Sequence, residues 1–260
     1  MDDMEIKNLF NLKGKTALVT GGSQGIGKAI SLALAEYGAD LVINYLSNKD
    51  LAEQTKKEII GKGVKCWLME CDLYQVDSAK MISQFLDKNG LSPDILVLNA
   101  SVQYRKAWDE VTHEEFEAQI NINFRASLFL IQELYPHMKK NKWGRIVTLG
   151  SVQQSRPHPE MIVYAASKMA QLSMVKNLAS QIGKYGVTIN NLAPGVFPTI
   201  RNEEVLQNEK YKAMVEGKIP LGFIGDPEDC AATTLLLCSD AGKYITGQDI
   251  FVDGGMGLNF

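Results

Sequence analysis

Three side chains in the segment GSVQQSRPHPEMIVYAASKMA have types and a spacing that suit proton transfer. Tyr164 and Lys168 stand four residues apart, which places a phenol and an ammonium on one face of a helix. A free tyrosine has a pKa near ~10, and a fixed cation beside it favours the phenolate. Ser151, thirteen residues before Tyr164, could hydrogen-bond the same substrate oxygen. These residues predict a site that exchanges a proton with an oxygen atom of its substrate.

A glycine-rich loop near the N-terminus adds a second component to this chemistry. Residues 20–27 read TGGSQGIG and join a short apolar run to a helical pattern. Glycines allow a tight turn, and the helix that follows offers free N–H groups to a pyrophosphate. The alternative is a plain glycine-rich turn, but the place of the loop between the first strand and the first helix favours a dinucleotide. Together with Tyr164 and Lys168, the loop predicts hydride transfer to or from a carbonyl.

The elements that must position these residues alternate along the chain. Seven apolar runs have strand character: residues 16–20, 40–45, 64–72, 94–100, 144–151, 186–194 and 249–255. Helical patterns separate them, most clearly at 25–38 and 49–60. This alternation predicts an α/β fold, a single Rossmann domain over residues 1–260 with a doubly wound, seven-stranded parallel sheet and helices on both faces. Ligands of such sheets bind at the carboxyl ends of the strands, where Ser151 and the glycine loop fall.

Composition and charge narrow the class of protein. The chain has 260 residues and is 45% hydrophobic, so it can form one large domain. A net charge of −3 and the absence of a long apolar run predict no nucleic-acid or membrane partner. The cysteines (Cys66, Cys71, Cys230, Cys238) have no zinc spacing, and the N-terminus has no apolar signal core. We therefore expect reduced thiols, a cytoplasmic location and no metal site.

The motifs as a set resemble those of the short-chain dehydrogenases/reductases over residues 12–257. Residues 20–27 match the nucleotide loop T-G-x-x-x-G-x-G of that family, and Ser151, Tyr164 and Lys168 match its catalytic set. Asn99 and Ala100 match part of an N-N-A-G signature in which Leu98 and Ser101 replace the first Asn and the Gly. This departure puts the local turn in question, whereas Asn99 is retained.

The resemblance implies a role for each matching residue. Tyr164 would exchange the proton, Lys168 would assist it and hold the nicotinamide ribose, and Ser151 would hydrogen-bond the developing oxyanion. Asn123 would anchor a water that links Lys168 to solvent. The implied cofactor contacts, besides Tyr164 and Lys168, are Gly21, Ser23, Gln24, Gly25, Ile26, Gly27, Tyr45, Ser47, Asn48, Asp72, Leu73, Asn99, Ala100, Ser101, Pro194, Gly195, Phe197 and Thr199.

The segment after the second strand favours NADP over NAD. An NAD site usually has an acidic residue at the end of that strand, whereas Tyr45 stands here. Ser47, Asn48 and Lys49 can bind a 2′-phosphate, although they can also simply cap the next helix. The segment contains no arginine, and Gln24 stands where NADP-preferring relatives often carry a basic residue. NAD therefore stays possible.

Within the family, the segments LFNLKGKTALVTGG, VQYRK, SVQQS and VDGGM resemble gluconate 5-dehydrogenases and related sugar-acid dehydrogenases. This likeness implies carbohydrate metabolism, with a sugar acid or related polyol as substrate and Gln103, Arg105 and Gln153 as its contacts. Arginine can hold a carboxylate through two parallel hydrogen bonds, but Arg105 can also be a solvated loop charge. Residues 196–220 predict a lid over the site, or else a surface helix without a gating role.

Two other functions use the same motifs. A 3-oxoacyl-thioester (acyl-carrier-protein) reductase of fatty acid synthesis shares the catalytic set, although the acidic balance of the chain disfavours an acidic carrier protein as partner. A non-catalytic dinucleotide sensor would keep the fold, but such proteins usually lose the tyrosine or the lysine. The family resemblance also implies a homo-oligomer, a tetramer, formed through the helix after Asn123 and the helix that carries Tyr164.

Overall fold

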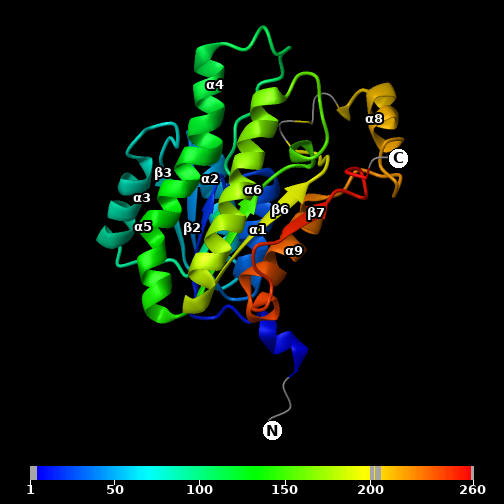
Figure 1. The fold of residues 1–260 in the computed structure, drawn as a ribbon. Coiled ribbons are helices and arrows are strands. Elements are labelled where there is room, and N and C mark those ends of the chain that lie inside the picture. The colour runs from blue at the N-terminus through cyan, green and yellow to red at the C-terminus, as the bar shows by residue number, and fades with distance from the viewer. Residues whose placement is uncertain (1–4, 200–201, 203–205, 259–260) are drawn as a thin grey trace.

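Seven parallel strands form one sheet in the computed structural model, which describes residues 5–199, 202 and 206–258. The strand order is β3-β2-β1-β4-β5-β6-β7 (Figure 1). The strands are β1 (Thr16–Thr20), β2 (Asp40–Tyr45), β3 (Cys66–Glu70), β4 (Ile95–Leu98), β5 (Gly144–Leu149), β6 (Val187–Pro194) and β7 (Asp249–Val252). This confirms the predicted doubly wound parallel sheet.

The order of the strands reverses at β1, which lies between β2 and β4. Val19 of β1 is opposite Ile43 on one side and Val97 on the other. The chain leaves β1 and β4 in opposite directions across the sheet, so a crevice opens beyond the carboxyl ends of these two strands. This is where the glycine loop and the residues after β4 meet.

Helices cover both faces of the sheet (Figure 1). The longer ones are α1 (Gly25–Glu36), α2 (Lys49–Ile60), α3 (Ser78–Lys88), α4 (His113–Ile120), α5 (Ala126–Asn141), α6 (Ile162–Ile182), α8 (Glu209–Glu216) and α9 (Pro227–Cys238). The short helical turns are η1 (Ile6–Phe10), η2 (Asn121–Arg125), η3 (Val152–Gln154), η4 (Gly183–Tyr185) and η5 (Asp240–Gly242). None of the helices in the described ranges is long and apolar enough to span a membrane.

Two apolar cores hold these layers to the sheet. Successive strand residues point to opposite faces, so Ala17 and Val19 join one core and Leu18 joins the other. The first core packs α1, α2 and α9 against the sheet, and the second packs α3, α5 and α6. Because the strands are buried on both faces, they are continuous apolar runs in the sequence.

A π-helical turn, η2, interrupts the long helical segment that contains α4 and α5. Thr112 caps α4 by accepting a hydrogen bond from the Glu115 N–H, while Glu115 bonds back to the Thr112 N–H. Asn123 lies in the π turn and is fully buried. Turns of this kind are frequent at functional sites, and here the extra residue directs the Asn123 side chain toward the segment after β4.

Burial also settles the state of the cysteines. All four are free and buried. Burial raises the pKa of Cys66, Cys230 and Cys238 to about 12, and that of Cys71 to about 11. Because the thiolate is the reactive form, these side chains are unreactive core residues.

Candidate active site

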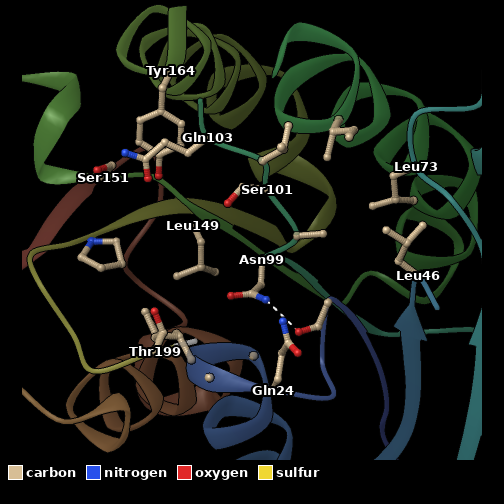
Figure 2. A pocket seen from close by; sticks show the side chains of 18 of the residues that line it. Gln24, Leu46, Leu73, Asn99, Ser101, Gln103, Leu149, Ser151, Tyr164 and Thr199 are labelled. Atoms are coloured by element: carbon tan, nitrogen blue, oxygen red, sulfur yellow. Dashed lines mark hydrogen bonds between the residues drawn. The ribbon is translucent and has the colours of Figure 1, made fainter. Parts of the chain in front are cut away.

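A cavity of about 750 Å³ opens at the carboxyl ends of the strands. All the residues that the sequence places in the site line it, except Lys49, Asn123 and Arg105. Figure 2 shows Tyr164, Ser151 and Gln103 gathered at one end, and Leu46 and Leu73 at the other. The cavity is therefore elongated, with the proton-transfer groups at one end and the segments after β2 and β3 at the other.

The glycine loop is shaped by close contacts that exclude side chains. A Cβ atom at Gly27 would lie 2.2 Å from the Gly21 carbonyl oxygen and 2.5 Å from Asn99 Nδ2. Gly25, the first residue of α1, has a φ of +51°, which L side chains rarely adopt. The loop thus brings its backbone and the N-terminus of α1 to the wall of the cavity, an arrangement that fits a pyrophosphate.

Asn99 ties the loop to the end of β4. Its Nδ2 donates to the carbonyl oxygens of Thr20 and Gly21, at 3.0 Å each, and its backbone N–H donates to Thr20 Oγ1. The Ala100 N–H donates to the same hydroxyl at 3.0 Å. The turn is therefore held by Asn99 and Thr20, so the replacements at Leu98 and Ser101 leave it formed.

The segment after β2 combines capping with exposure to the cavity. Asn48 Oδ1 caps α2 by accepting from the Leu51 N–H at 3.1 Å, which leaves its NH₂ group as the part that can donate to a phosphate. The Tyr45 phenol donates to Glu70 Oε2 at 3.1 Å, and burial together with this bond raises the pKa of Tyr45. The helix-capping alternative for this segment is thus correct for Asn48, although Ser47 and Asn48 also line the cavity.

The proton-transfer residues come from β5 and α6 and are nearly inaccessible to solvent. Ser151 follows β5 and its Oγ accepts from the Gln153 N–H at 3.2 Å, so its own hydrogen can be donated elsewhere. Tyr164 and Lys168 are 6% and 1% exposed, and Lys168 Nζ lies 5.7 Å from the centre of the Tyr164 ring. All three side chains face the same end of the cavity.

Side chains link Lys168 to Asn123. Lys168 Nζ donates to the Leu149 carbonyl at 2.6 Å and to Gln171 Oε1 at 3.1 Å. Gln171 in turn donates to Ser127 Oγ, which donates to the Asn123 carbonyl. The Asn123 side chain bonds the backbone of Val102 and the hydroxyl of Ser167, and so acts from behind the cavity wall.

This geometry matches that of known enzymes. A family model, Enoyl-(Acyl carrier protein) reductase, matches residues 21–257. The 3-oxoacyl-[acyl-carrier-protein] reductase of Staphylococcus epidermidis is 35% identical over 243 residues, which are 93% of this chain and 98% of that protein. The chain belongs to the short-chain dehydrogenase/reductase family. It is therefore an oxidoreductase of a family that acts on CH–OH and keto groups.

Solved structures from two branches of the family have the same fold. A 3-oxoacyl (acyl-carrier-protein) reductase of Agrobacterium tumefaciens with NADP bound is 32% identical, with a TM-score of 0.93 and 98% of each chain covered. A gluconate 5-dehydrogenase of Burkholderia cenocepacia, in complex with NADP and tartrate, is 28% identical with a TM-score of 0.91. The comparison covers 98% of this chain and 100% of that one.

Gln103 and Gln153 line the end of the cavity at which Ser151 and Tyr164 lie. Gln103 Nε2 donates to the sulfur of Met161 at 3.0 Å, which is a weak acceptor. Gln153 Oε1 is buried and has no hydrogen-bond partner within the described part of the chain. Both residues line the cavity beside Ser151, so they can bind polar groups next to the reacting carbon.

Arg105 belongs to a cluster at the mouth of the cavity, the rim cluster (Arg105, His158 and Glu160). Arg105 donates to Glu160 Oε2 through Nη2 at 3.1 Å and Nε at 3.3 Å. It also interacts with Tyr211 of α8. Tyr104, the preceding residue, lines the cavity. The structure thus places Arg105 beside the cavity and already paired with a carboxylate.

Fourteen further lining residues were not named individually as site residues, although some fall in the predicted loops and lid: Asn44, Leu46, Cys71, Tyr74, Val102, Tyr104, Ala118, Ile122, Leu149, Gly150, Val152, Met161, Val196 and Asn202. Several of them, such as Leu149 and Gly150, directly adjoin predicted residues at strand ends, and the strand-end rule could have included them. Ala118 and Ile122 come from the α4–η2 segment, and no local signal in the sequence marks them. The predicted lid lies partly outside the described residues, at 200–201 and 203–205.

Proposed function

We propose that the protein is an NADP(H)-dependent oxidoreductase that interconverts a secondary alcohol and a ketone on a hydroxylated substrate, a sugar acid or related polyol. The Gln153 side chain carries this proposal. Its buried Oε1 has no hydrogen-bond partner among the described residues, and leaving such an acceptor unsatisfied costs about 1–3 kcal/mol. A substrate hydroxyl beside the reacting carbon would donate to it, whereas a methylene group would leave it unpaired.

The complex of the Burkholderia cenocepacia gluconate 5-dehydrogenase supports the same substrate class. That structure holds NADP and tartrate, a dicarboxylate with two hydroxyl groups. NADP is also present in the Agrobacterium tumefaciens reductase. In the present chain, the glycine loop would hold the pyrophosphate, and Ser47 and Asn48 would contact the 2′-phosphate. The other predicted cofactor residues line the same cavity, so they would contact the dinucleotide along its length.

The chain's own residues have simple roles in this reaction. The bound dinucleotide supplies the hydride chemistry. In the direction of reduction, Ser151 donates a hydrogen bond to the substrate oxygen, and Tyr164 transfers its phenolic proton to that oxygen. Lys168, fixed by the Leu149 carbonyl and Gln171, stabilises the phenolate that remains. In oxidation the proton returns from the substrate hydroxyl to Tyr164.

A second candidate is a 3-oxoacyl-thioester reductase. The Staphylococcus epidermidis and Agrobacterium tumefaciens relatives with that activity favour it. The ketone of such a substrate lies between the methylene next to the thioester and an alkyl carbon, which is a methyl in the acetoacetyl form, so it would offer no hydroxyl to Gln153. The two candidate functions therefore differ in whether the substrate offers a hydroxyl to Gln153 Oε1.

Turnover of defined ketones by the purified protein tests the proposal. NADPH and NADH consumption would be followed with 5-keto-D-gluconate, other keto-sugars and an acetoacetyl thioester. We expect turnover of the keto-sugar acid, with NADPH preferred to NADH. Turnover of the thioester alone would overturn the substrate class and leave the reaction type standing. Equal rates with both cofactors would overturn the NADP assignment.

We also propose that the enzyme is a homotetramer in the cytoplasm. Large apolar side chains are exposed on neighbouring helices: Phe129 of α5 (44%), and Ile162 (55%) and Met169 (47%) of α6. Burial of this face between copies would remove them from water. Four free, buried cysteines are consistent with a reducing compartment. Light scattering after gel filtration measures the mass, and a monomeric mass would contradict the assembly.

A further inference from the structure

A buried polar cluster beneath Ser151 has no part in the reaction described above. Gln154 of η3, Asn191 of β6 and Asp249 of β7 come from three elements and meet behind the cavity wall; we call this cluster the amide clamp. Gln154 Nε2 donates to both carboxylate oxygens of Asp249, at 2.8 and 2.7 Å. Asn191 Nδ2 donates to Asp249 Oδ1 at 2.7 Å, and Thr148 Oγ1 donates to Asn191 Oδ1 at 2.7 Å.

The clamp fixes which way its two amides point. A carboxylate presents only acceptor oxygens, so both amides must turn their NH₂ groups toward Asp249. Gln154 is 7% exposed and Asn191 is fully buried, so water does not offer either of them an alternative. The oxygen of Gln154 is consequently directed away from Asp249 and toward the backbone N–H of Ser151, at 3.3 Å.

The clamp also packs against the backbone that precedes Ser151. A Cβ atom at Gly150 would lie 2.4 Å from Asn191 Nδ2 and 2.5 Å from Gln154 Oε1, so a side chain there would displace the amides of the clamp. The Gly150 N–H donates to the Leu192 carbonyl at 2.7 Å. The peptide that carries Ser151 is thus held by the clamp on one side and by β6 on the other.

We propose that Gln154, Asn191 and Asp249 are positioning residues for the Ser151 hydroxyl. The Asp249 carboxylate sets the orientation of the Gln154 amide, and Gln154 fixes the turn in which Ser151 Oγ accepts from the Gln153 N–H. The Ser151 hydrogen then remains directed to the substrate oxygen. The inference rests on the proposed function of Ser151 as a donor, and adds that a carboxylate on the last strand maintains that function.

Asp249→Asn is the sharpest variant, because it keeps the size of the side chain. Both carboxylate oxygens contact Gln154 Nε2, so in either orientation the new amide turns an NH₂ group against that of Gln154. If Gln154 turns round instead, its NH₂ meets the Ser151 N–H. We expect kcat to fall on the order of 10-fold, less than the ~10²-fold loss on removal of a preorganised donor itself, with an unchanged Kd for NADPH.

A double-mutant cycle separates positioning from a general structural effect. If the clamp acts through the Ser151 hydroxyl, Asp249→Asn lowers kcat in the wild-type background and has no further effect in Ser151→Ala. An equal loss in both backgrounds, or no loss in the wild type, would overturn the proposal. Full activity of Ser151→Ala alone would overturn the proposed function of Ser151 and the clamp together.

Asn190 provides a matched control for Asn191. It is the neighbouring residue of β6, is equally buried, and also ties β6 to the segment around β7, through the Ile245 carbonyl and the Gln248 N–H. Its side chain points to the other face of the sheet, away from Ser151. Asn191→Ser should lower kcat as Asp249→Asn does, whereas Asn190→Ser should leave it unchanged. A loss of kcat that is the same for both serine variants would contradict positioning through Ser151.

Discussion

The floor and the mouth of the cavity are built in different ways. The floor comprises Ser151 and Lys168, supported from behind by Gln154 and Asn191; each of the four is less than 9% exposed and is held by hydrogen bonds from several strands and helices. At the mouth, the side chains of Arg105 and Glu160 in the rim cluster are 41% and 47% exposed to solvent. Interactions on the floor are therefore strong and fixed, whereas those in the rim cluster are screened by water.

This difference separates the two tasks of the enzyme. A buried network holds the groups that transfer the proton, so their geometry does not depend on which substrate enters. The rim cluster is held by an exposed ion pair, and a substrate carboxylate could take the place of Glu160 at a small cost in free energy. We infer that the buried residues of the floor determine the type of reaction and that the rim cluster at the mouth contributes to the choice of substrate.

The largest effect is expected on the floor. Tyr164→Phe removes the phenolic proton but keeps the ring, so kcat should fall by ~10²–10⁴-fold while the Kd for NADPH changes little. Steady-state kinetics and fluorescence titration with NADPH measure the two quantities. Retention of wild-type turnover by this variant would show that another group transfers the proton, and the comparison between floor and mouth would lose its basis.

A smaller and charge-selective effect is expected at the mouth. If Arg105 binds a substrate carboxylate, Arg105→Ala should raise the KM for a keto-sugar acid by about 10-fold, the value of one charge-assisted hydrogen bond. The KM for an uncharged keto-sugar should not change. Glu160→Gln removes the competing carboxylate and should lower the KM for the acid by roughly 2- to 5-fold.

The two rim variants together distinguish binding from support of the loop. If Arg105→Ala raises the KM for charged and uncharged substrates alike, the Arg105–Glu160 pair only holds the loop that contains Arg105. Under that alternative, Glu160→Gln should impair the enzyme in the same way as Arg105→Ala. Opposite signs for the two variants are expected only if Arg105 contacts the substrate.

The smallest effect concerns the titration of His158. The Glu160 N–H donates to His158 Nδ1 at 3.2 Å, so the neutral ring carries its proton on Nε2. Burial, followed by the charge of Arg105, lowers the pKa of His158; Lys218 and Arg156 add to this, and Glu160 opposes it. Arg105→Ala should therefore raise that pKa, which an NMR titration of the ring protons measures. Arg105 Nη2 lies 3.4 Å from His158 Nε2, and a pKa that falls or stays constant would contradict the influence of Arg105 on the ring.

The sign of the associated change in stability follows from linkage. Because the folded-state pKa of His158 is below that of the unfolded chain, the unfolded state binds the proton first as the pH falls. The free energy of unfolding therefore decreases below a pH of ~6.5, the ordinary value for histidine. Arg105→Ala should make this decrease smaller, since the two pKa values move closer together.

Much of the fold and of the floor could be predicted from the sequence because the signals are local. The seven strands are short apolar runs, and the four-residue spacing of Tyr164 and Lys168 places both on one face of a helix. The glycine loop is recognisable because Gly25 has a φ that L side chains rarely adopt and Gly27 has no room for a Cβ atom. Local patterns therefore predicted residues that line both ends of the cavity.

The remaining features depend on contacts between distant segments. Gln154, Asn191 and Asp249 are each unremarkable in their local sequence, and only the pairing of β5, β6 and β7 brings them together. The pairing of Arg105 with Glu160 likewise spans 55 residues between two loops. Neither periodicity nor turn chemistry reports such a contact, so the sequence could not predict what surrounds Ser151 or what holds Arg105.

The most direct test of the central claim compares two substrates at Gln153. The kcat/KM of the wild-type enzyme would be measured with 5-keto-D-gluconate and with analogues that lack a hydroxyl next to the ketone, and again in Gln153→Leu. We expect a preference of ~10- to 10²-fold for the hydroxylated ketone in the wild type, from the cost of an unpaired buried acceptor, and little preference in the variant. Equal kcat/KM values for both substrates in the wild type would contradict it.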